Sequence, residues 1–125
     1  MNTSFTNLIK NLRHDNRFAA AAAAAEERFG DAVRSLDGEG TIASLAYEDD
    51  ATDLINEARR DEATEVAAAF ETEALEWSTE DLPSQEEHKQ RMKIVNEVLD
   101  KVHDAANAQL EDLCDRIVAN ENTPA

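Results

Sequence analysis

Apolar side chains recur at steps of three and four residues through the last third of the chain. Pro83 stands directly before Ser84, and Ser84 and Glu87 have the S-x-x-E spacing of a helix-capping box. The pattern therefore predicts one amphipathic helix over residues 84–119, about 53 Å long at 1.5 Å per residue. Its helix-packing seam, which needs a partner helix, consists of Met92, Val95, Leu99, Val102, Ala106, Leu110, Leu113 and Ile117.

A second helical pattern covers residues 51–77, with Asp50 or Thr52 placed to cap its first turn. The connection from Ser78 to Leu82 is short, so this helix and the one that follows should run antiparallel as neighbours. The apolar side of this second helix consists of Leu54, Ile55, Ala58, Val66, Ala69, Phe70 and Trp77.

The first third of the chain predicts a helix over residues 4–36 that can break once. Apolar positions run at helical spacing on both sides of Asp15 and Asn16, two residues that can end or restart a helix. Gly30 weakens the helix by about 1 kcal/mol without stopping it. The alanines at residues 19–25 either let another helix approach closely or form a low-complexity spacer, because alanine helices form without a tertiary partner.

These patterns place the chain in the all-α class, as an antiparallel helical bundle or long helical hairpin of three to four helices. Three Gly and two Pro in 125 residues are too few for the turns of an all-β fold. The length suits a single domain over residues 1–125. Within it we expect a Gly-rich connector over residues 37–41 and a short C-terminal tail over residues 120–125.

Negative charge gathers in one region of the chain. Residues 37–87 hold seventeen Asp and Glu against Arg59 and Arg60, so they carry about −15 of the formal net charge of −16. Crowded carboxylates repel one another, which disfavours the compact state and indicates a role in partner choice, solubility or salt adaptation. The predicted outer side of the second helix and the turn after it form an acidic face of Glu57, Asp61, Glu62, Glu65, Glu71, Glu73, Glu76 and Glu80.

The sequence carries no complete catalytic, cofactor or metal motif. The loop from Asp37 to Ile42 resembles the middle of an EF-hand calcium loop, but no register supplies both the turn glycine and the acidic ligands. Asp100 and His103 give one acid-x-x-His pair, whereas a di-iron bundle needs two Glu-x-x-His pairs and two further Glu. Acidic surroundings raise the pKa of a thiol, so Cys114 is not expected to be a nucleophile. We therefore expect no catalytic residues, no cofactor and no metal, and a protein that is not an enzyme.

The acidity also bears on partners and location. A strongly acidic protein is repelled by nucleic acid and attracted to basic protein surfaces, so we expect a protein partner, with a homo-oligomer as a further arrangement. No apolar run approaches the roughly 20 residues of a membrane span. One cysteine fits the cytoplasm or a particle assembled there. Lys10, Arg13 and Arg17 lie beside apolar residues, which suits packing on the bundle, a partner groove or a membrane surface.

Three functions fit these features. The first is a structural, assembly or adaptor component, for example of a phage particle or another large complex, that acts through its long helix seams. The second is an acidic nucleic-acid mimic that occupies the basic cleft of a nucleic-acid-processing enzyme, as inhibitors of the anti-restriction or anti-CRISPR type do, although only the composition is similar to theirs. The third is adaptation to high salt, which the regional confinement of the acid argues against. The long amphipathic patterns favour the first.

Overall fold

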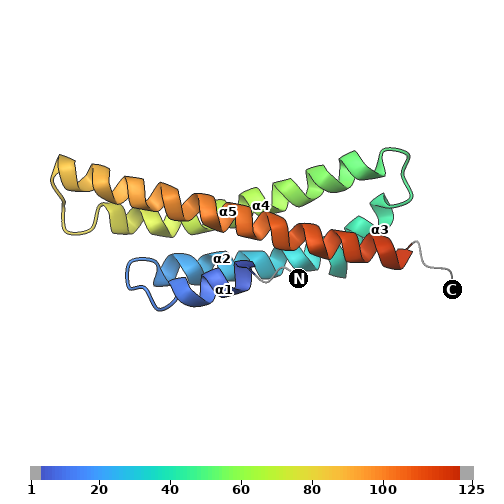
Figure 1. Cartoon of the computed structure of the whole chain (residues 1–125), viewed down its shortest axis with the longest axis horizontal. Coiled ribbons are helices and arrows are strands. Elements are labelled where there is room, and N and C mark those ends of the chain that lie inside the picture. The colour runs from blue at the N-terminus through green and yellow to red at the C-terminus, as the bar shows by residue number, and fades with distance from the viewer. Residues whose placement is uncertain (1–3, 122–125) are drawn as a thin grey trace.

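The computed structural model describes residues 4–121, whose long helices alternate in direction along one axis (Figure 1). This part of the chain contains α-helices and one π-helical turn, and no strand. In chain order these are α1 (Ser4–Leu12), α2 (Ala19–Val33), the turn η1 (Arg34–Gly38), α3 (Thr41–Leu45), α4 (Ala51–Ser78) and α5 (Gln85–Glu121). The all-α antiparallel bundle predicted from the sequence is confirmed.

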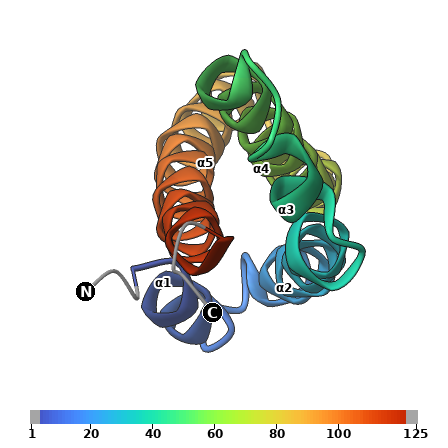
Figure 2. The ribbon, with the colours of Figure 1, turned by 90° about the vertical axis from the view of Figure 1, so that its right-hand side faces the viewer.

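Viewed along its long axis, the bundle has α1, α2, α4 and α5 in chain order around a shared interior (Figure 2). The most extensive contacts join α4 to α5 and α2 to α4, and α1 closes the bundle by packing on α5 and α2. Phe18, Val66, Phe70, Val95 and Val102 have almost no exposed surface. Burying a side chain of this size stabilises a fold by about 1.5–3 kcal/mol, so this interior holds the long helices together.

The alanine run on α2 is part of the packed interior. Ala21, Ala22 and Ala25 are fully buried, and α2 lies along α4, whose buried residues include Ala63 and Ala74. Small side chains on both helices allow a close approach of the two backbones. The alanines therefore serve helix packing, and the alternative of a low-complexity spacer does not apply.

The predicted helix over residues 4–36 is two helices, because the chain reverses between α1 and α2. The Asp15 carboxylate accepts hydrogen bonds from the backbone N–H of Arg17 at 3.0 Å and from its Nε at 3.1 Å, which holds the turn. The reversal lets α1 pack against α5 and buries Phe5 and Ile9, apolar surface that one straight helix would leave in water. Gly30, by contrast, lies within α2 without ending it.

The connector predicted for residues 37–41 is shorter than expected, because η1 ends at Gly38 and α3 begins at Thr41. α2 continues directly into η1, and Gly40 adopts the left-handed conformation, with a φ of 75°, that starts α3. α3 was not predicted, since a single five-residue turn has no helical period to detect; its Ile42 is fully buried.

The other helix limits differ from the predicted ones by one or two residues. α4 ends at Ser78 instead of residue 77, and α5 runs from Gln85 to Glu121 instead of from 84 to 119. The predicted tail therefore begins after Glu121, and residues 122–125 lie outside the described part of the chain. None of the helices between residues 4 and 121 combines the length and the apolar character needed to cross a bilayer.

Candidate protein-binding surface

The acidic face predicted for α4 lies mainly on the outside of the bundle. Glu62 and Glu73 are half-buried at its edges, where α4 turns toward its neighbours. At about 100° per residue the buried positions of α4 centre on the opposite side of the helix. The exposed members of the face are Glu57, Asp61, Glu65, Glu71, Glu76 and Glu80.

Most of these carboxylates have no cationic partner within the described chain. Glu62 accepts from Nη2 of Arg28 at 2.8 Å, in a partly buried pair that joins α4 to α2. The other seven members of the acidic face form no ion pair with any residue between 4 and 121. Their negative potential is therefore directed at solvent or at another molecule.

A cleft of about 390 Å³ lies at the carboxyl end of α4, between this helix and the start of α2. The α1–α2 turn and the α4–α5 turn come to the same end of the bundle, on the left in Figure 1. The cleft is open to solvent, and part of the acidic face forms one of its walls. Its lining residues are Asn16, Arg17, Ala20, Glu73, Glu76, Trp77 and Glu80.

Arg91 of α5 binds the carboxyl end of α4 beside this cleft. Its Nη1 donates hydrogen bonds to the backbone carbonyls of Trp77 at 3.0 Å and Glu80 at 2.7 Å. Its Nη2 pairs with Glu87 at 2.9 Å. The guanidinium carbon of Arg91 lies 5.4 Å from the Trp77 ring centre, and that of Arg17 lies 5.6 Å away, so two cations contact one indole.

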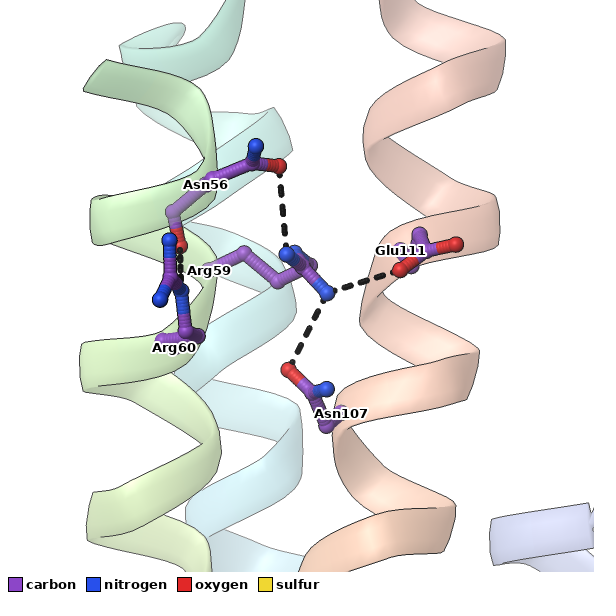
Figure 3. Close-up of polar contacts among 5 residues, drawn as sticks. All are labelled: Asn56, Arg59, Arg60, Asn107 and Glu111. Carbon is purple, nitrogen blue, oxygen red and sulfur yellow. Dashed lines mark hydrogen bonds and ion pairs between the residues drawn. The ribbon is translucent and has the colours of Figure 1, made fainter. Parts of the chain in front are cut away.

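A polar cluster between α4 and α5 is the feature that sequence reasoning missed (Figure 3). Arg59 is only 7% exposed, and its guanidinium donates to Asn56, to Asn107 and, at 2.8 Å, to Oε2 of Glu111. The spacing of the sequence could have predicted its burial, because residue 59 lies four residues after Ile55 and four before Ala63, on the buried side of α4. Every fully buried side-chain nitrogen and oxygen in the described chain has a hydrogen-bond partner, and those of this cluster are included.

The predicted helix-packing seam of α5 faces the interior of its own bundle. Leu99 and Leu113 are half-buried against it, and Met92 is half-buried. The seam is therefore occupied by α4, α1 and the other elements that pack on α5, and no large apolar side chain in the described part of α5 is exposed. The fully or nearly fully buried members of the seam are Val95, Val102, Ala106, Leu110 and Ile117.

Cys114 and His103 are the reactive side chains of α5 that the sequence singled out. Burial raises the pKa of the Cys114 thiol to about 11, with the nearby Asp115 and Glu111 adding to the effect and Arg59 opposing it. His103 is partly exposed and lies 3.8 Å from the Asp104 carboxylate. Between residues 4 and 121 no group of three or more His, Cys, Asp or Glu side chains is arranged to hold a metal ion.

This arrangement suits contact by charge and shape. Exposed carboxylates along one helix can attract a basic surface over a distance of about 8–10 Å at moderate salt, and the cleft adds a recess at one end of that face. No protein-family model, no curated protein and no solved structure matches the chain.

Proposed function

We propose that this protein acts without catalysis, as a structural, assembly or adaptor component that binds a basic protein surface through the acidic face of α4. The observation that carries the proposal is the row of exposed carboxylates that lack ion-pair partners among the described residues. Like charges three or four residues apart each destabilise a helix by a few tenths of a kcal/mol. A basic partner would remove that repulsion on binding.

The α4 face supports this contact better than the α5 seam does. Residues such as Val102 and Leu110 are already buried within the bundle, so they are not free to bind another chain. A second copy that bound through the same face would present the same carboxylates to the α4 face and be repelled by them. A different protein with a basic surface is therefore the expected partner.

A nucleic-acid mimic is the second candidate, and the carboxylate spacing supports it less well. From Glu57 to Glu76 seven carboxylates of the acidic face lie along about 29 Å of helix, or one per about 4–5 Å. One DNA strand carries a charge per about 3.4 Å and a duplex one per about 1.7 Å. The face has less than the charge density of one strand, which suits an ordinary basic protein surface at least as well.

Recovery of the tagged protein from cells at about 50 mM and about 500 mM salt, followed by mass spectrometry, tests the proposal. The test variant is Asp61→Lys, Glu65→Lys and Glu71→Lys, which reverses three exposed charges on α4. The control is Glu97→Lys, Asp100→Lys and Asp104→Lys, which makes the same change in net charge at exposed positions of α5. We expect the α4 variant to lose a partner that the wild type and the α5 variant retain at low salt.

Two results would contradict this function. If both variants keep the partner, the acidic face is not the binding surface. If both lose it equally, only net charge matters. A nucleic-acid-processing enzyme as the recovered partner, inhibited in a manner that added DNA relieves, would favour the mimic instead.

A further inference from the structure

The lining of the cleft at the carboxyl end of α4 contains three carboxylates without an ion-pair partner in the described chain and one arginine that is already paired. Glu73, Glu76 and Glu80 line it, and none of them forms an ion pair with a residue between 4 and 121. Arg17 is the cation in the lining, and its Nη2 and Nε already bind the two carboxylate oxygens of Asp15 at 2.8 and 3.1 Å. An incoming cation would therefore find three carboxylates that Arg17 does not neutralise.

The surroundings of Trp77 already bind guanidinium groups of the chain itself. The last turn of α4 contains no basic residue, although its carbonyl groups form the negative end of the helix dipole. Arg91 reaches these carbonyls from α5, and both Arg91 and Arg17 contact the Trp77 ring. Two arginines from different elements thus lie against the indole at this end of α4, and one of them also binds its carbonyls, which indicates that the indole and the carbonyls suit a guanidinium.

We infer that the cleft is the anchoring point of the acidic face and takes an arginine side chain from the basic partner. This inference rests on the proposed function, and it assigns one position on the surface as the specific one. Arginine fits better than lysine, because its planar guanidinium binds a carboxylate through two donors and stacks on an aromatic ring. The volume of about 390 Å³ falls within the usual range of about 300–1,000 Å³ for ligand pockets.

Trp77 makes the inference testable on the purified protein, because it is the chain's one tryptophan and lines the cleft. A hexa-arginine peptide is titrated at about 20 mM salt while tryptophan fluorescence is recorded. We expect a saturable change in the wild type. The variant Glu73→Gln, Glu76→Gln, Glu80→Gln should bind at least about tenfold more weakly, since it loses the carboxylates of the cleft.

The matched control removes three charges from the same helix outside the cleft, as Glu57→Gln, Asp61→Asn and Glu65→Gln. This control reduces the long-range attraction between the acidic protein and the basic peptide as much as the cleft variant does. It should nevertheless weaken peptide binding by less than about threefold. Equal weakening by the two variants, or no saturable change in the wild type, would overturn the inference. Hexa-lysine or spermine binding as tightly as hexa-arginine would overturn the assignment to arginine.

Folding of the variants is checked by circular dichroism. If the triple variant in the cleft loses helix, the single change Glu76→Gln at an exposed position is compared with Glu65→Gln instead. The result of this titration can be distinguished from the result of the partner-recovery experiment that tests the proposed function. Equal weakening in this titration, together with loss of the partner by the α4 charge-reversal variant, would reject the cleft and keep the acidic face.

Discussion

Arg59 shows at the scale of one residue how a charge is kept inside a thin bundle. Its stem fills space between α4 and α5, while its guanidinium reaches Glu111, whose side chain is 57% exposed. The pair thus lies at the edge of the interior, where one member is buried and the other remains hydrated. The stem and the charge of Arg59 contribute to stability separately, and two substitutions distinguish them.

We predict that Arg59→Ala lowers the free energy of unfolding by about 2–4 kcal/mol, because it leaves a cavity and removes the donor shared by three partners. Arg59→Met should cost less than about 1.5 kcal/mol, since it keeps the volume of the stem and Glu111 can return to water. Urea denaturation measures both values. Equal losses would mean that the hydrogen bonds, and not the packing of the stem, account for the contribution of Arg59.

Cys114 gives a prediction that depends on pH. Burial raises the pKa of its thiol from the ordinary 9.0 to about 11, so between these values the folded chain holds a proton that the unfolded chain has lost. The free energy of unfolding must therefore fall as pH rises from about 9 to about 11. We expect the urea midpoint to fall over this range in the wild type, and to fall less in Cys114→Ala.

The same burial should protect the thiol from reagents. At pH 8 we expect Cys114 to react with a disulfide reagent only after urea is added, because the thiolate is the reacting form and the side chain is 2% exposed. Rapid labelling of the folded protein would show that the thiol is accessible and would remove the basis of the pH prediction.

At the scale of elements, the long helices could be predicted because their signals are local. The capping box is one such signal, and in the structure the backbone N–H of Glu87 donates to the hydroxyl of Ser84 at 3.2 Å. The break between α1 and α2 could not be fixed in the same way. Asp15 only permits it, and what selects it is tertiary burial: of Phe5 and Ile9 when α1 packs on α5, and of Phe18 against aromatic rings of α4.

The candidate surface likewise has one part that local sequence signals predict and one part that depends on contacts between distant segments. The exposed carboxylates of α4 could be predicted from helical spacing, since one helix determines which of them share a face. The cleft could not, because Arg17 and Trp77 lie sixty residues apart and meet only when the α1–α2 turn folds back onto α4. Burial of Arg59 was missed because its charge argued against an interior position that its spacing indicated.

At the scale of the whole molecule, the bundle has a narrow interior. The helices α1, α2, α4 and α5 surround one interior, which is lined in part by alanine (Figure 2). Alanine-lined packing between α2 and α4 accounts for part of this, since small side chains build a narrow interior. The extended surface spreads the carboxylates along the bundle, yet each carboxylate of the acidic face on α4 lies within about two helical turns of the next one along the helix.

Repulsion among these carboxylates should make stability depend on salt. Several pairs on the acidic face, such as Asp61 with Glu65, are three or four residues apart, and together they destabilise the bundle by about 1–2 kcal/mol at low ionic strength. The screening length is about 30 Å at 0.01 M salt and only a few ångströms near 1 M, so added salt should relieve most of this repulsion. We predict that the thermal midpoint rises by about 3–8 °C between these conditions, as followed by circular dichroism. The variant Asp61→Asn, Glu65→Gln, Glu71→Gln should start from a higher midpoint at low salt and rise less. A midpoint that is independent of salt, or equal slopes for the two proteins, would mean that the acidic face does not strain the free protein, and a basic partner would then have no such repulsion to relieve.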